Sequence, residues 1–166
     1  MRPLSFLFAP LLLSVFVVCG CGSSDDSDVE PVPDISASYN FAARLQDNEC
    51  ISLDFWEVFA FANDNGNGLP IFSAELEQDG VALTAVLELP DCVLAGDVAA
   101  GGAFALAGSC HDDAMERALS LTGVAEVDGL GWAVGEGGLV IEVSLSGGDS
   151  DTEDCSVISD IEGSGN

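Results

Sequence analysis

The feature that most constrains the fold is an alternation of apolar and polar residues on both sides of Asp79-Gly80. Apolar and polar residues alternate over residues 72–77, and apolar residues recur at every second position over residues 81–89. This period of two is that of a β-strand with one buried face, and an Asp-Gly pair between two such runs indicates a hairpin. The positions expected to face the core are Phe72, Ala74, Leu76, Val81, Leu83, Ala85, Leu87 and Leu89.

The rest of the chain after residue 34 has the same character, because no window sustains helical apolar spacing for long. Glycine-rich or Asp-Gly turns are expected at residues 101–102, 128–129, 135–138 and 147–148. Together with the hairpin, the remaining runs predict about nine strands. These runs are residues 36–46, 50–61, 94–99, 103–109, 118–127, 138–146 and 155–161.

Many short strands without crossover helices predict an all-β fold, and sequential hairpins favour an antiparallel up-and-down (meander) β-barrel of about 8–9 strands. Barrel closure also removes the open edges on which strand-rich proteins pair with other chains. A β-sandwich is the alternative. The segments ELEQDGVALTAVLEL, GGAFALAG and LSLTGVAEV resemble small lipocalin-like barrels of bacterial envelope proteins. An eight-stranded barrel can hold one small ligand, so the resemblance implies a possible carrier of an apolar molecule.

The first twenty residues predict a signal peptide. Arg2 precedes an uncharged apolar run from Pro3 to Val18, which is short for a membrane span and ends at small residues. Gly20-Cys21 resembles the lipobox of bacterial lipoproteins, in which a small residue precedes the cysteine that is acylated. Cys19 fits less well because bulky Val18 would lie next to the cleaved bond.

The lipobox resemblance implies that Cys21 carries palmitate-type acyl chains and becomes the first residue of the mature protein. Two or more chains anchor a protein stably at a membrane, whereas one holds it marginally. Gly22 follows the anchor, where an Asp would favour the inner membrane in this family, so the resemblance favours the outer membrane. The expected organisation is a signal peptide at 1–20, a lipidated, acidic, disordered tether at 21–34, a β domain at 35–163 and a tail at 164–166.

The chain has a net charge of −26, with 29 acidic residues and no lysine. Such a surface repels phosphate, which excludes nucleic acid as a partner, and it gives the domain no attraction to anionic lipid. High charge keeps a protein soluble, and it also allows weak binding of divalent cations.

Four cysteines follow the anchor, and an even number in an exported chain indicates disulfides. If Gly101-Gly102 is a hairpin tip, Cys92 and Cys110 lie opposite each other at the open end, within bridging distance. By elimination, Cys50 pairs with Cys155 and links an early strand to the last. A zinc site has the wrong spacing and a single histidine to draw on.

Two acidic regions invite a chemical interpretation. His111-Asp112-Asp113, with Glu116 nearby, has the residues of a metal site or an acid–base pair, and a solvated loop beside a disulfide is the favoured alternative. Residues 63–68 have the oxygen-rich alternation and sixth-place glycine of a calcium loop, but Ala74 stands where the bidentate Glu belongs. A turn is therefore favoured there, and a solvated loop at residues 147–154.

The sequence contains no phosphate-binding loop, dinucleotide fingerprint or nucleophile elbow. It predicts a non-enzymatic envelope lipoprotein without a cofactor, which binds or interacts with partners at a membrane surface. The alternatives are a lipocalin-like carrier of a small apolar ligand and a metal-assisted hydrolase around His111. Early aromatic residues are expected to fill the core: Phe55, Trp56, Phe59 and Phe61.

Overall fold

The computed structural model describes residues 31–50, 53, 55–64, 66–88, 92–111, 115–128, 131–145 and 154–165. These residues form nine strands, a short α-helix and one turn of 3₁₀-helix, η1. The strands are β1 (Ala37–Asn48), β2 (Asn63–Asp64), β3 (Pro70–Asp79), β4 (Ala82–Leu87), β5 (Val93–Val98), β6 (Ala103–His111), β7 (Met115–Asp128), β8 (Gly131–Leu145) and β9 (Cys155–Gly165). The helix α1 spans Phe55–Val58 and η1 spans Ala100–Gly102.

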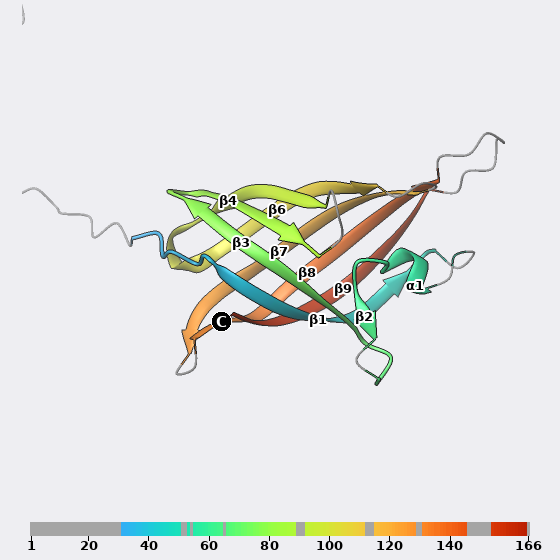
Figure 1. Ribbon diagram of the computed structural model, residues 1–166, viewed down its shortest axis with the longest axis horizontal. Helices are drawn as coiled ribbons and strands as arrows, with labels where there is room; N and C mark the ends of the chain where they lie inside the picture. The colour runs from blue at the N-terminus through green and yellow to red at the C-terminus, as the bar shows by residue number, and fades with distance from the viewer. Residues whose placement is uncertain are drawn as a thin grey trace, which may run out of the picture.

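Eight of the strands close into an antiparallel barrel, which confirms the predicted all-β meander barrel (Figure 1). From β3 to β9 each strand pairs with the next in sequence, β9 then pairs with β1, and β1 pairs with β3 to complete the circle. The ninth strand, β2, adds two residues to β3 outside this circle.

Both hairpins predicted from local sequence are present, and the second has the expected register. Asp79 pairs with Ala82 around a turn in which Gly80 has a φ of 67°. In the second hairpin Val93 pairs with Ser109 and Val98 with Phe104, which is the register expected from a tip at Gly101. Gly101 has a φ of 78°, a left-handed conformation that glycine adopts without steric cost.

The barrel interior is filled with apolar side chains contributed by alternate positions of the eight barrel strands. Phe41 stacks on Tyr39 and on Phe72, with ring centroids 5.7 and 5.1 Å apart, and Phe61 contacts Phe72 edge-on at 5.4 Å. Phe59 lies 5.9 Å from Phe61, so one aromatic cluster joins β1 and β3 to the segment after α1. This cluster confirms that Phe59 and Phe61 belong to the core, whereas Trp56, which was also expected there, is 36% exposed.

The segment 50–61 is not a strand, contrary to the prediction. It contains α1 and a turn, and its residues Val58, Phe59 and Phe61 are buried against the barrel core. Arg117, buried on the inner side of β7, donates to the carbonyl oxygen of Glu57 from Nε at 3.2 Å and from an Nη at 2.6 Å. Hydrogen bonds from this buried arginine therefore hold α1 against β7.

Residues 135–138 do not form a turn, because β8 runs through them. Gly135 and Glu136 lie at a register shift between β8 and β9, so the glycine-rich stretch is an irregular part of a long strand. A Cβ at Gly137 would approach the Thr122 carbonyl oxygen and the Ile161 side chain to 2.7 Å, so close packing favours glycine there.

Three smaller expectations also need correction. Val81 is 55% exposed because it lies in the β3–β4 turn rather than on the inner face of a strand. The expected tail begins at residue 164, but β9 continues to Gly165. The folded part begins before residue 35, since Val32 packs against the core and the Pro33 carbonyl accepts a hydrogen bond from Gln78.

The two ends of the barrel differ. Residues 31–36 approach the end that carries the β3–β4 and β5–β6 hairpins, and α1 lies at the opposite end (Figure 1). Both disulfides are at this opposite end, because each joins residues at the strand termini remote from these hairpins. We call it the distal end.

Candidate functional site

The two disulfides are the predicted pairs. Cys92 and Cys110 have Cα atoms 4.5 Å apart, and Cys50 and Cys155 have Cα atoms 5.0 Å apart. Both fall in the range that a disulfide spans. The first joins neighbouring strands β5 and β6, and the second joins the chain just after β1 to the start of β9, across a sequence separation of 105.

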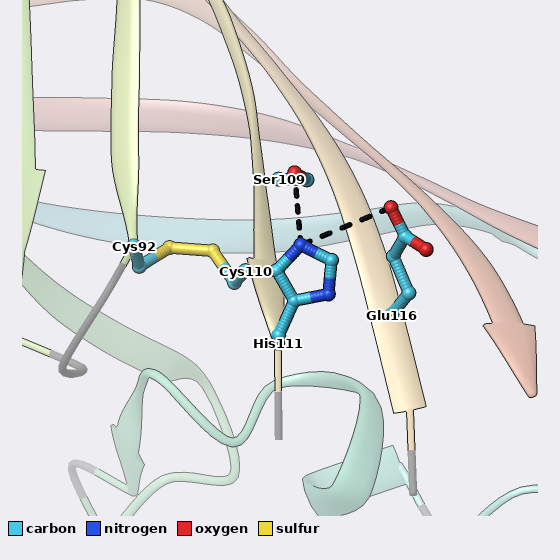
Figure 2. Close-up of polar contacts among 5 residues, drawn as sticks. All are labelled: Cys92, Ser109, Cys110, His111 and Glu116. Atoms are coloured by element: carbon cyan, nitrogen blue, oxygen red, sulfur yellow. Dashed lines mark hydrogen bonds and ion pairs between the residues drawn. A yellow bond between two sulfur atoms is a disulfide. The ribbon is translucent and has the colours of Figure 1, made fainter. Parts of the chain in front are cut away.

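His111 lies on the outer face of β6 at the distal end, between Ser109 and Glu116 of β7 (Figure 2). Its Nε2 is 3.3 Å from the Ser109 Oγ and 3.9 Å from a carboxylate oxygen of Glu116. A Ser-His-acid relay needs the hydroxyl and the acid on opposite ring nitrogens. Here both contacts are made by one nitrogen, and the side chains of His111 and Glu116 are both more than half exposed. The geometry is that of a surface cluster, which does not favour the hydrolase alternative.

The other two members of this acidic run, Asp112 and Asp113, lie outside the described residues, as do Cys21 and the loop over residues 147–153. Within the described ranges, no three His, Cys, Asp or Glu side chains come together around a possible metal position. No helix in the described part of the chain has the length and apolar character needed to cross a membrane.

The calcium-like stretch over residues 63–68 is organised by one carboxylate. Asp64 Oδ1 accepts hydrogen bonds from the backbone N–H groups of Gly66 at 2.8 Å and Gly68 at 3.1 Å. This is a side chain closing its own turn, as Asp residues commonly do. The geometry agrees with the interpretation of this stretch as a turn after β2.

The packing of the barrel interior tests the alternative that the protein carries a small apolar ligand. Aromatic and branched side chains fill the barrel from its wall to α1. An eight-stranded barrel has an interior that side chains alone can fill. The described residues therefore provide a packed core where a carrier needs a ligand cavity.

A hollow of about 480 Å³ is lined mainly by β1, β9 and β8, which run side by side, and includes the core residues Ala43 and Ile161. Its polar rim carries three carboxylates and one guanidinium, and its floor is made of small or aliphatic residues. This volume is within the range of ligand sites, about 300–1,000 Å³. The lining residues are Ala42, Ala43, Arg44, Leu69, Gly135, Glu136, Gly137, Asp160, Ile161 and Glu162.

Arg44 is the cation of this hollow. It stands directly opposite Asp160 in the β1–β9 ladder, yet the Asp160 carboxylate accepts a hydrogen bond from Gln46 instead. Within the part of the chain that the structure describes, the Arg44 guanidinium forms no ion pair or hydrogen bond. Its donors are therefore available to a carbonyl or carboxylate oxygen from outside the chain.

Beside the hollow, the barrel seam is open. β1 pairs with β3 from Ala37 to Ala42, where the two strands diverge, and from Ala43 onwards β1 pairs with β9 alone. Residues 44–47 are all exposed. Sequence reasoning missed this feature, because the point at which two strands separate depends on tertiary geometry and has no local signal.

Two side chains near the start of the barrel have shifted pKa values. Burial raises the pKa of Tyr39 to about 12, and its hydroxyl donates to the Ile35 carbonyl oxygen at 3.2 Å. Hydrogen bonds from the Ser36 hydroxyl and backbone N–H lower the pKa of the exposed Asp34 below its usual 3.8. Both groups secure the chain where it enters the barrel, and neither lies at the hollow.

Comparison with known proteins does not identify a function for this chain, so the functional proposal rests on its sequence and structure. No family model matches the sequence, and neither a curated protein nor a solved structure is similar to it.

Proposed function

We propose that this chain is a bacterial envelope lipoprotein, acylated at Cys21, that acts as a non-enzymatic binding module at a membrane surface. The sequence supports the attachment through the apolar leader that ends at Gly20-Cys21. The outer membrane is the proposed location, because Gly22 follows the anchor.

The observation that carries the proposal is that the two ends of the barrel differ. The chain reaches the fold beside the β3–β4 hairpin, where Gln78 donates to the Pro33 carbonyl oxygen at 3.0 Å. The distal end carries α1, both disulfides and the His111 cluster. A module held by its N-terminus would present this end to its partners, and residues 22–30 would extend over about 30 Å at most.

The packed interior and the geometry at His111 support an interaction module over the two alternatives. A carrier requires internal volume, which the aromatic cluster around Phe41 and Phe72 fills. A Ser-His-acid hydrolase requires the hydroxyl and the acid on separate ring nitrogens, whereas Ser109 and Glu116 approach the same nitrogen of His111.

The attachment is tested by expressing the full chain in bacteria fed an alkyne analogue of palmitate. We expect label in the wild type and in Cys19→Ala, and none in Cys21→Ala, because acylation requires the thiol of the cysteine after Gly20. Membrane fractionation of the same cells reports whether the protein follows the label. Label that persists in Cys21→Ala would refute the anchor.

A further inference from the structure

We infer that the open edge of β1, residues 43–48, accepts an extended, basic segment of another protein as an added strand. This inference rests on the proposed function and names the kind of partner that the module would bind. Two features of the structure carry it: the unpaired strand edge and the acidic hollow beside it.

The edge supplies the backbone hydrogen bonds. Over residues 43–48, β1 pairs with β9 on one side, and no strand among the described residues pairs with it on the other. Alternate N–H and C=O groups of a strand point to opposite sides, so about half of these groups face away from β9. An extended peptide can pair with such an edge through its main chain. A register shift between Leu45 and Asp47 interrupts this edge, and the Asn48 N–H already donates to Asp47 Oδ1, so regular pairing is limited to residues 43–45.

The hollow supplies the selectivity for side chains. In β-strand addition, backbone bonds give affinity and pockets beside the edge select alternate side chains. The hollow begins at Ala42 and Arg44 on the outer face of β1 and extends across Asp160 and Glu162 of β9 to Glu136 of β8. A lysine or arginine side chain on the outer face of the added strand would lie along the aliphatic floor, with its charge near these carboxylates.

The net charge of the molecule determines the sign of the charge that its partner should carry. A chain with a net charge of −26 attracts a basic segment and repels a second copy of itself. Arg44 makes no internal ion pair among the described residues, and it can donate to a carbonyl oxygen of the added strand. On the other face of β1, exposed Leu45 offers an apolar contact to the next side chain of that strand.

The test uses a synthetic peptide of about eight residues that alternates lysine with threonine, added to the full folded domain. We expect binding by calorimetry, together with slowed amide exchange confined to residues 43–48. A matched peptide carrying N-methyl groups at alternate residues keeps the charge and loses half of its N–H donors, so we expect it to bind about tenfold more weakly. A glutamate–threonine peptide should not bind.

Variants of the protein separate the hollow from general electrostatics. The double variant Asp160→Asn, Glu162→Gln should weaken binding of the lysine peptide about tenfold. The control Asp97→Asn, Glu126→Gln removes the same charge from positions in β5 and β7 that do not line the hollow, and it should change affinity less than about twofold.

Three outcomes would overturn the inference. Equal binding of the N-methylated peptide would mean adsorption to a charged surface, and exchange protection away from residues 43–48 would place the peptide elsewhere. Sedimentation showing a dimer that protects the same amides would assign the edge to a second copy. Each outcome leaves the test of Cys21 acylation unaffected, so the edge can fail while the lipoprotein assignment stands, and the reverse also holds.

Discussion

Tyr39 is the residue whose behaviour follows most directly from its surroundings. It is the one tyrosine of the chain and is fully buried, stacked on Phe41, with its hydroxyl bonded to a backbone carbonyl oxygen. Burial disfavours the phenolate, which is why the pKa of Tyr39 rises from 10.0 to about 12. The chain has no lysine, so little else titrates in this range.

We therefore expect the folded protein to lose stability between pH 10 and 12. The unfolded state releases the Tyr39 proton near pH 10 and the folded state holds it to about pH 12, so the contribution is complete below pH 10 and disappears above the folded pKa. The loss should be on the order of 2 kcal/mol. Ultraviolet absorbance of the phenolate measures the pKa, and urea unfolding across this range measures the stability.

Tyr39→Phe is the control for this titration. It removes the ionisable group and retains the ring, so the alkaline loss of stability should largely disappear. A folded wild type whose absorbance titrates near pH 10 would contradict the buried environment of Tyr39.

At the scale of secondary-structure elements, the packing of β9 against the aromatic cluster requires a glycine. Gly163 lies in β9 next to the aromatic cluster, and a Cβ at this position would come within 2.6 Å of two ring carbons of Phe41. Phe41 itself is fixed between Tyr39 and Phe72, so its ring has little freedom to move away.

Gly163→Ala should therefore destabilise the protein by about 1–3 kcal/mol, the usual cost of overpacking a core. Gly135→Ala is the matched control, because a Cβ at Gly135 meets nothing within 4 Å. Thermal or urea unfolding of the two variants measures the difference. Equal stability of the two would show that the contact between Phe41 and β9 is looser than described.

The strands that sequence predicts well are those determined by local signals. The turns at Asp79-Gly80 and Gly101 set two hairpin registers, and the second of these gave the Cys92–Cys110 pair. The segment 50–61 was mispredicted because its aromatic residues have strand propensity, while its actual conformation depends on the barrel end that it covers. Gly135 and Gly137 predict a turn from sequence alone, whereas strand curvature and close packing also favour glycine.

The candidate site was predictable only in part. The sequence predicted the His111 cluster and both disulfides, since these depend on composition and on hairpin register. It missed the hollow and the open edge, because Arg44, Glu136 and Asp160 come together only when three long strands curve around one another. Neither spacing nor periodicity carries that information.

At the scale of the whole molecule, the two disulfides should differ in what they contribute. Cys50–Cys155 closes a loop with a sequence separation of 105, and Cys92–Cys110 closes one of 18. In the chain-entropy account, the longer loop restricts the unfolded state more, which gives about 4–5 kcal/mol against about 3 kcal/mol.

We therefore expect Cys50→Ala, Cys155→Ala to lower the free energy of unfolding more than Cys92→Ala, Cys110→Ala. Urea unfolding of the two double variants under oxidising conditions tests this order, and each variant serves as the control for the other. If the short-loop variant is the less stable of the two, strand-local packing around Cys92 outweighs loop closure.

The pairing of β1 with β9 has a consequence for how the barrel closes. β1 forms part of its backbone bonding with β9, so the circle cannot close without residues 155–165. Without β9, the remaining barrel strands form an open sheet whose two edges are β1 and β8. Closure therefore depends on β9, and a variant without residues 155–165 has neither a complete wall nor the Cys50–Cys155 bond.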